Sequence, residues 1–221
     1  MKKEITYAQF LELARLERVL LKDRLQHVTF DALHLLALSD GMLDACNALD
    51  IAASLYASGK VRFVAFNGSD GSGVLTSAPQ SQWMGGQGYV RELMKRGVPR
   101  DGLILTAPAM HTRGETDAFI SLAKERGWRT VGCLTLPYHL PRVFCCMVKS
   151  MQEAGYWPTV WAVYPPRTDW LLPMLGSQAR KMSTPLEEAF DDAAKLLREY
   201  IPKGFAAPIE DVLAYVRSRQ E

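Results

Sequence analysis

Short apolar segments alternate with longer segments of mixed polarity along most of this chain. Each apolar segment has the length of a buried strand, and each connection between two of them is long enough for a helix. Because parallel strands need such crossovers, this alternation predicts a mainly parallel sheet with helices on both faces. The expected strands span residues 31–38, 61–66, 102–106, 129–136 and 159–164, and the helices between them span 42–58, 89–96, 116–126 and 141–154.

The predicted fold is therefore an α/β fold with a Rossmann-like, doubly wound, mainly parallel five-stranded sheet. An amphipathic helix from Tyr7 to Leu25 precedes the first strand, and two helices with charged outer faces, over 185–200 and 208–219, follow the last one. We expect these last helices to form an appendage and not a second catalytic domain. The expected parts are an N-terminal helix that packs on the core within 1–28, the Rossmann-like domain over 29–165 and a C-terminal helical extension over 166–221.

Composition and charge exclude several classes of protein. A chain of 221 residues that is 48% hydrophobic can bury the core of one α/β domain. Its net charge of +2, with basic and acidic residues interleaved, argues against a nucleic-acid partner. We see no secretory signal and no apolar run long enough for a bilayer, so we expect a cytoplasmic protein without a membrane partner. The cysteines lack metal-ligand spacing and are expected to be buried free thiols in a reducing compartment.

Arginines stand near the expected starts of two helices. Arg113 follows His111 and Thr112, and Arg142 follows His139. A helix start carries partial positive charge, so an arginine there is unfavourable unless an anion shares the site. Both clusters also follow strands, and ligands bind at the carboxyl edge of open parallel sheets. We therefore predict that Arg142 holds an anion, and that Arg142→Ala weakens binding while changing stability by only about 1 kcal/mol.

Ordinary helix chemistry offers another interpretation of the same residues. Thr112-x-x-Glu115 has the spacing of a capping box, and Pro141 suits a first helical turn. A structural salt bridge from Arg142 to Glu115 or Asp117 is a further alternative. The sequence leaves these alternatives open.

A loop rich in glycine and serine, residues 67–73, follows the second expected strand. Its backbone amides could approach a phosphate or a ribose, but it has neither a Walker pattern nor Gly-x-Gly-x-x-Gly, and a surface connection is the simpler interpretation. We expect it to face the same cleft as His139, because strand exits gather at one edge. His34 lies inside the first apolar run and is interpreted as a packed core histidine.

Six short motifs occur in order over roughly residues 31–165. They are the strand from Asp31, Ala52-x-x-Leu55-Tyr56-x-x-Gly59-Lys60, Phe66-Asn67-Gly68, Leu93-x-x-x-Gly97-Val98-Pro99, Thr112-x-x-Glu115 and His139-x-x-Arg142. In this order and spacing they resemble the YdcF/SanA/ElyC family, catalogued as domain of unknown function 218. The resemblance implies a Rossmann-like sheet with a ligand cleft, S-adenosylmethionine binding for the namesake member and a role in cell-surface biogenesis for the envelope members. The chain departs from the family at residues 37–40, where a glycine-rich turn is usual, and at Gly85-Gly86, where Glu-Ala is usual.

Two classes of function follow from these residues. The first is a small-molecule transferase or hydrolase for a phosphorylated or adenosyl-type substrate, in which His139 or His111 moves a proton and Glu115 orients one of them. The second is a regulatory module that binds the same ligand without turnover, or a protein of cell-envelope biogenesis. S-adenosylmethionine is the expected cofactor, and no metal is expected because the four histidines show no ligand pairing. The expected ligand-binding residues are Arg142, Arg113, Thr112, Asn67, Gly68, Ser69, Ser39 and Asp40.

Overall fold

One sheet of five parallel strands forms the centre of the molecule, in the order β3-β2-β1-β4-β5. The computed structural model describes residues 5–23, 25, 27–39, 42–43, 45–70, 83–175 and 182–219. Every pairing within this sheet is parallel, which confirms the predicted Rossmann-like architecture. The strands are β1 (Phe30–Leu35), β2 (Val61–Asn67), β3 (Leu103–Thr106), β4 (Thr130–Leu134) and β5 (Thr159–Val163).

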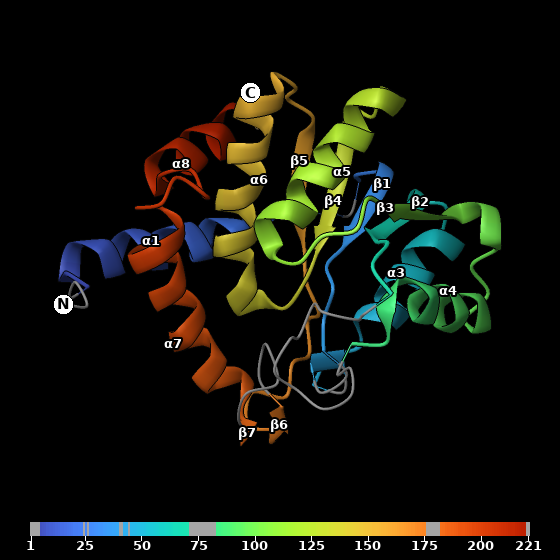
Figure 1. Cartoon of the computed structure of the whole chain (residues 1–221), viewed down its shortest axis with the longest axis horizontal. Coiled ribbons are helices and arrows are strands. Elements are labelled where there is room, and N and C mark those ends of the chain that lie inside the picture. Colours follow the sequence, from blue (N-terminus) through green and yellow to red (C-terminus); the bar gives the residue numbers. More distant parts are fainter. Residues whose placement is uncertain are drawn as a thin grey trace.

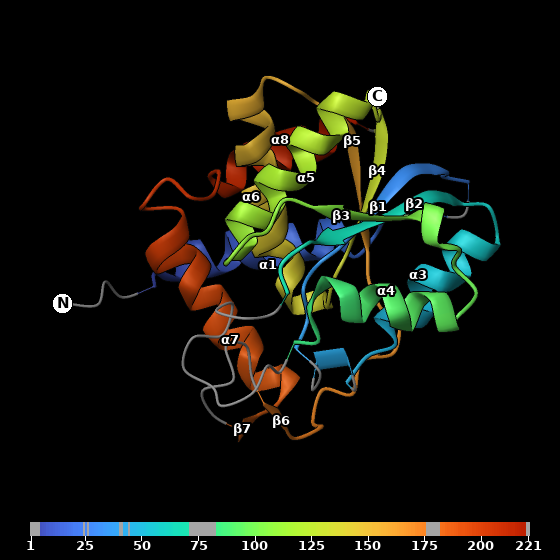
Figure 2. The same cartoon turned by 45° about the vertical axis from the view of Figure 1, so that its right-hand side comes forward.

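Helices cover both faces of the sheet (Figures 1 and 2). Helices α3 (Ala48–Ala57) and α4 (Gly85–Lys95) lie on one face, and α5 (Thr112–Arg126) and α6 (Leu140–Ala154) lie on the other. The strand order changes direction between β1 and β4, and this switch point is where open α/β sheets bind ligands. Two short 3-10 turns, η1 (Arg100–Gly102) and η2 (Pro137–His139), precede β3 and α6.

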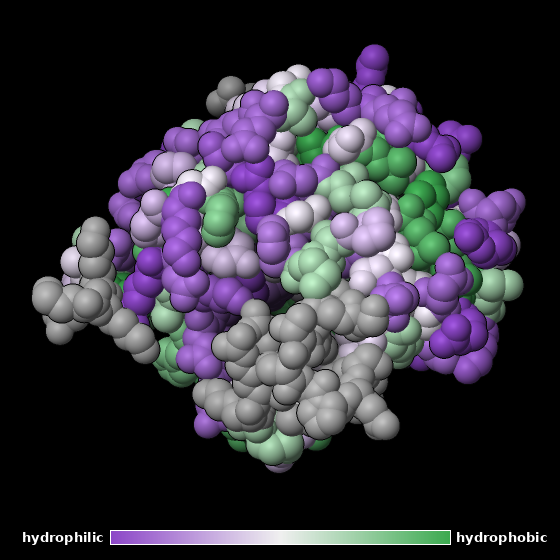
Figure 3. Space-filling model, viewed as in Figure 1, coloured by the Kyte–Doolittle hydropathy of each residue, from purple (hydrophilic) through white to green (hydrophobic). Residues whose placement is uncertain are grey.

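The terminal helices pack beside α6. Helix α1 (Tyr7–Leu20) contacts α6 and α8 (Ile209–Ser218), while α7 (Pro185–Lys195) contacts η2 and continues into a π-helical turn, η3 (Leu196–Tyr200). A small antiparallel pair, β6 (Met174–Leu175) and β7 (Met182–Ser183), precedes α7. The face in Figure 3 is mostly hydrophilic, with apolar surface on the β3 side, where a groove of about 640 Å³ runs between β3 and α5.

Side chains of the C-terminal extension close the outer edge of β5. The Tyr215 hydroxyl accepts a hydrogen bond from Val160 N at 2.7 Å, and Arg219 donates to the Val160 carbonyl. Arg219 also pairs with Asp23, which accepts from Ala162 N at 2.8 Å. Exposed strand edges invite pairing with other chains, so this extension protects one edge of the sheet.

The first strand is shorter than the apolar pattern predicts. It ends at Leu35. Leu36 N still donates to the Leu134 carbonyl of β4, but the two amides after it bond to side chains. Ala37 N donates to the carboxylate of Glu115 at 3.2 Å, and Leu38 N donates to the Tyr89 hydroxyl at 2.9 Å. The apolar run beyond Leu35 thus belongs to the wall of a site and not to the sheet.

Two helices also begin at other residues than the sequence predicted. Residues 42–43 are helical as predicted, but a turn at 45–47 separates them from α3, which begins at Ala48 with Asn47 as its N-cap. Helix α4 already begins at Gly85, although the sequence predicted irregular structure up to Gly88. Because Gly86 has no side chain, this helix start packs closely on the end of β2, where a Cβ would lie 2.6 Å from the Asn67 carbonyl oxygen. The possible lid within residues 74–88 falls largely outside the described residues.

Core positions agree with the sequence interpretation. His34 is fully buried in β1 and stacks on Phe119, with ring centroids 4.4 Å apart, and burial lowers its pKa to about 3. It is a neutral packed histidine, as predicted. All four cysteines are buried free thiols. Among the described residues, no helix is both long enough and apolar enough to cross a membrane.

Gly68→Ala should destabilise the protein by about 1–3 kcal/mol, the usual cost of forcing extra atoms into a packed region. A Cβ at Gly68 would lie 2.3 Å from the Thr106 carbonyl oxygen, which is backbone and cannot rotate away. Urea unfolding followed by circular dichroism measures the loss. Ser121→Ala, on the exposed face of α5, is the matched control and should stay near the parent. Equal stability of the two variants would contradict the close approach of β2 and β3 at this point.

Candidate active site

A small cavity of about 100 Å³ lies at the carboxyl edge of the sheet, at the switch point between β1 and β4. Its walls come from the segment after β1, the start of α5, the η2–α6 junction and the α7–η3 junction. Loops that are far apart in the sequence thus meet here, as the parallel topology requires. Six of the predicted site residues line the cavity: Ser39, His111, Thr112, Glu115, His139 and Arg142.

Glu115 is a buried carboxyl group in the cavity wall. Its oxygens accept hydrogen bonds from Ala37 N at 3.2 Å and from Asn67 Nδ2 at 3.4 Å. Burial raises the pKa of Glu115 to about 7, although these hydrogen bonds and the charge of Arg142 oppose the rise. A carboxyl group with this pKa exchanges a proton near neutral pH, which suits an acid or a base in catalysis.

Asn67 fixes the entry to α5. Its Nδ2 donates to the Ala109 carbonyl at 2.8 Å, and its Oδ1 accepts from Ala109 N and from Ser69 N, each at 3.0 Å. The amide therefore joins the end of β2 to the segment that leads into α5, and it contacts Glu115 from behind. Asn67 supports the cavity without lining it.

His139 lies beside a carboxylate from the C-terminal extension. Its Nδ1 is 2.9 Å from Oδ1 of Asp192 on α7, and both side chains are buried. The positive charge of Arg142 helps to hold the pKa of Asp192 at about 2 despite burial, so this carboxylate is ionised and only accepts hydrogen bonds. A terminal nitrogen of Arg142 also lies 3.1 Å from Nδ1, but the same nitrogen is closer to Asp192 Oδ1, at 2.6 Å, and donates there. The proton of neutral His139 therefore sits on Nδ1, and Nε2 carries the lone pair. Burial also lowers the pKa of His139, which favours the neutral base.

Arg142 is part of the same buried cluster, and this corrects two expectations. It is only 4% exposed, and it pairs with Asp192 through Nε at 2.8 Å and through a terminal nitrogen at 2.6 Å. Its other terminal nitrogen donates to the Thr112 hydroxyl at 3.0 Å. The predicted anion at this helix start is present, but it is the Asp192 carboxylate. The alternative ion pairs of Arg142 with Glu115 or Asp117 are not among its contacts in the described structure, and its buried pair with Asp192 now predicts that Arg142→Ala costs stability.

The start of α5 does not form the capping box that was one of the alternatives. His111 is the N-cap, and its Nδ1 accepts a hydrogen bond from Gly114 N at 3.0 Å. Thr112 is already in the helix and turns its hydroxyl to Arg142, while Glu115 turns inward. Because its Nδ1 is occupied as an acceptor, neutral His111 carries its proton on Nε2 and faces the rim as a donor.

The remaining predicted residues do not line this cavity. Arg113 is buried elsewhere, paired with Asp117 at 2.8 Å and with Glu153 at 2.5 Å, so its charge is already neutralised. Gly68 packs against the Thr106 backbone, and Ser69 accepts from Gly86 N. Asp40 and residues 71–73 lie outside the described residues. The described part of the 67–73 loop therefore reaches the His139 cavity only through Asn67.

Several cavity residues were missed by sequence reasoning. Lys195 and Tyr200 line the cavity from the α7–η3 junction, and the Arg142 guanidinium lies 5.1 Å from the Tyr200 ring centre. The extension expected to be a simple appendage thus supplies one wall. One signal was available, because Glu188, Asp192 and Leu196 recur at helical spacing and share a face. An acidic residue on a buried helix face indicates a buried partner of opposite charge, because an unpaired buried charge is costly.

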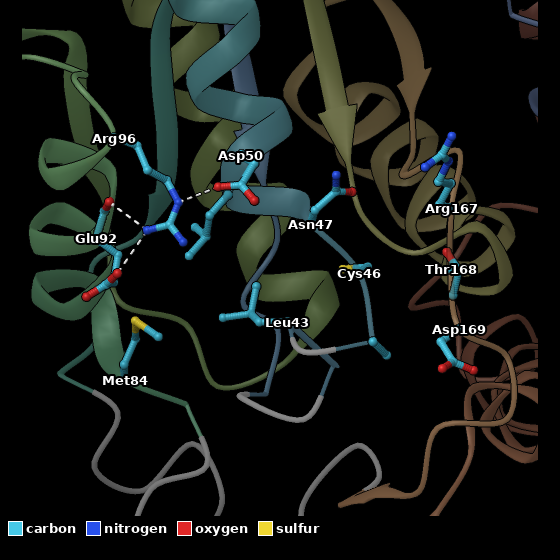
Figure 4. Close-up of a pocket in the computed structure, with 12 residues that line it drawn as sticks. Leu43, Cys46, Asn47, Asp50, Met84, Glu92, Arg96, Arg167, Thr168 and Asp169 are labelled. Carbon is cyan, nitrogen blue, oxygen red and sulfur yellow. Dashed lines mark hydrogen bonds and ion pairs between the residues drawn. The ribbon is translucent and has the colours of Figure 1, made fainter.

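A wider cleft of about 880 Å³ lies beside the N-terminus of α3 (Figure 4). Its main charges neutralise each other, because Arg96 pairs with Asp50 at 2.7 Å and with Glu92 at 2.9 Å. None of the predicted site residues lines it. In the part of the chain that the structure describes, no group of three or more His, Cys, Asp or Glu side chains is arranged to hold a metal ion.

Comparisons with known proteins add little to this geometry. No family model matches the chain, and no curated protein matches it. A search of solved structures returns the shikimate dehydrogenase of Mycobacterium tuberculosis, with 11% sequence identity and a TM-score of 0.26. That comparison covers 94% of this chain and 61% of the dehydrogenase. At this TM-score, the comparison identifies neither a substrate nor a cofactor.

Proposed function

We propose that the cavity is an active site in which His139 exchanges a proton with a small anionic substrate. The observation that carries this proposal is the 2.9 Å contact between His139 Nδ1 and ionised Asp192, which leaves Nε2 as the base. Arg142 and Lys195 bring two positive charges to this cluster, against one negative charge on Asp192. Glu115, with a pKa of about 7, is partly neutral at physiological pH. This balance favours an anion.

The proposed substrate is an adenosyl- or nucleotide-type molecule, either a phosphorylated compound or S-adenosylmethionine, whose carboxylate would be its anionic group. The cavity of about 100 Å³ is smaller than the roughly 300–1,000 Å³ of sites that enclose whole ligands, so it would hold the reacting end. The proposed reaction is transfer or hydrolysis, in which His139 Nε2 takes a proton from the attacking water or hydroxyl and protonated Glu115 donates one to the leaving group. The resemblance of the motifs to the YdcF/SanA/ElyC family supports the adenosyl ligand.

A binding module without turnover is the second candidate. It is favoured by the contacts of Arg142. The guanidinium nitrogens donate to Asp192 and Thr112, so no pair of them is left for a bidentate contact with a substrate. In this case the cavity would bind its ligand without converting it, and binding would be transmitted to the rest of the protein through α7. The two candidates differ in whether a bound probe is consumed.

His139→Gln should lower turnover of the probe substrate by roughly 10²–10⁴-fold, the usual contribution of a positioned acid or base. Glutamine keeps a polar side chain at this position but cannot accept a proton at neutral pH. S-adenosylmethionine and p-nitrophenyl phosphate serve as probes, with calorimetry for binding and product release for turnover. His27→Gln, at an exposed histidine, is the matched control. A probe that binds the parent and is never consumed supports the binding module, and full turnover by His139→Gln contradicts the assigned base.

A further inference from the structure

A second groove, of about 150 Å³, lies between α1 and α7 with the η2–α6 junction as its floor. Phe10 and Glu17 of α1 form one wall, and Phe190 and Asp192 of α7 form the other. The groove is distinct from the cavity. Among the four wall residues just named, Asp192 is the one that forms hydrogen bonds or ion pairs described above with cavity residues. It therefore offers a place for a ligand that never enters the candidate active site.

We propose that this groove binds a small organic cation with an apolar body, of the arylalkylamine class. The first argument is size and polarity. A cavity of about 150 Å³ with apolar walls is large enough to hold a benzene ring. Phe10 is 54% exposed and Phe190 is 68% exposed, so both rings have surface left to cover. Aromatic faces also attract a cation placed over them.

The second argument is charge. Glu17 is half-buried, burial raises its pKa, and among the described residues its carboxylate has no ion-pair partner. No lysine or arginine stands among the described residues of the groove wall. An ammonium group here would pair with Glu17 and lower the pKa of its carboxyl group, which opposes the rise caused by burial. The groove is thus built for a positive head and an apolar tail.

The third argument is unused hydrogen-bonding capacity at the floor of the groove. Tyr138 is 6% exposed, and its hydroxyl has no hydrogen-bond partner within the described part of the chain. Buried polar groups without partners cost free energy, which a bound N–H donor would recover.

Asp192 links the groove to the cavity. An ammonium ion beside this carboxylate would weaken its pull on the His139 proton and lower the pKa of His139 further. Ligand in the groove would then change the protonation of the cavity histidine without touching it. Binding itself does not depend on the proposed catalytic function, so the two proposals fail separately.

Titration calorimetry of the full chain with benzylamine and with benzyl alcohol tests the proposal. We expect benzylamine to bind at least tenfold more tightly than the neutral alcohol. Glu17→Gln should remove this preference, while Glu12→Gln, on the same helix but outside the groove wall, should keep it. Phe190→Ala should weaken both ligands. Because Glu17→Gln removes only an unpaired charge, it should melt like the parent, which a thermal scan checks.

A second experiment measures the pKa of His139 directly. Two-dimensional NMR follows the chemical shifts of the histidine ring nitrogens across a pH series. Benzylamine should lower the pKa of His139 in the parent, and benzyl alcohol should leave it unchanged. The proposal is overturned if benzylamine does not bind at millimolar concentration, if both ligands bind equally, or if Glu17→Gln keeps the parent's preference. Selective binding without any response of His139 would overturn the link through Asp192.

Discussion

Replacing Asp192 with alanine should lower the free energy of unfolding by about 3–5 kcal/mol, the usual cost of removing one partner from a buried ion pair. Arg142 is only 4% exposed, and Asp192 is 8% exposed, so neither charge can turn to water. The ion pair holds the pKa of Arg142 above its usual value despite burial, which keeps the guanidinium charged. Without Asp192, this charge would stay buried with only neutral contacts. Urea unfolding followed by circular dichroism measures the loss.

Two further variants make this expectation specific. Asp191→Ala changes the exposed neighbour on the same helix and should cost at most about 1 kcal/mol, the usual upper range for an exposed charged contact. The double variant Asp192→Leu/Arg142→Leu should be more stable than Asp192→Ala, because replacing both partners of a buried pair with apolar groups is often neutral. If Asp192→Ala unfolds like Asp191→Ala, then α7 does not dock on the start of α6, and the cavity loses its wall.

The fold could be predicted from sequence because its signal is local. Each buried strand is a short apolar run, and each crossover helix has its own period, so strand positions were predicted to within a few residues. The errors fall where tertiary contacts replace local ones. Ala37 and Leu38 look like strand residues, but their amides bond to Glu115 and Tyr89. Neither partner could be inferred from the run itself.

The site was predicted only in its local parts. Helix starts after parallel strands gather at one edge, so the meeting of Glu115 and His139 in one cavity follows from topology. The electrostatic partner of Arg142 does not follow, because Asp192 is 50 residues away in a helix that follows the last strand of the sheet. An argument from the helix dipole predicts that Arg142 needs an anion. It cannot say whether that anion is a ligand or the protein's own carboxylate.

Glu115→Gln should make the protein more stable than the parent at pH 8, by about 3 kcal/mol if the full effect of the raised pKa is expressed. The pKa of Glu115 is near 4.5 in the unfolded chain and about 7 in the folded protein. Below pH 4.5 the carboxyl is protonated in both states, and its contribution to stability is complete. As the pH rises, the unfolded chain releases the proton first, so the parent loses about 1.4 kcal/mol per pH unit until pH 7.

Glutamine cannot ionise, so the variant should lack this loss. The difference in unfolding free energy between variant and parent should rise between pH 4.5 and 7 and then level off. Asp192, whose pKa is lowered to about 2, acts in the opposite direction and at lower pH, where its contribution is lost as the pH falls. Glu125→Gln, on the exposed face of α5, is the matched control and should follow the parent at every pH.

The same measurement bears on the proposed substrate. When Glu115 is neutral, the positive charges of Arg142 and Lys195 outnumber the single negative charge of Asp192 and allow an anion to enter, whereas an ionised Glu115 would repel it. Bound phosphate should raise the pKa of Glu115 further, so the stability loss of the phosphate-saturated parent should begin at the same pH but extend to higher pH. If the parent and Glu115→Gln show parallel profiles without phosphate, Glu115 is ionised in the folded protein. The cavity would then favour a cationic group such as a sulfonium over a phosphate.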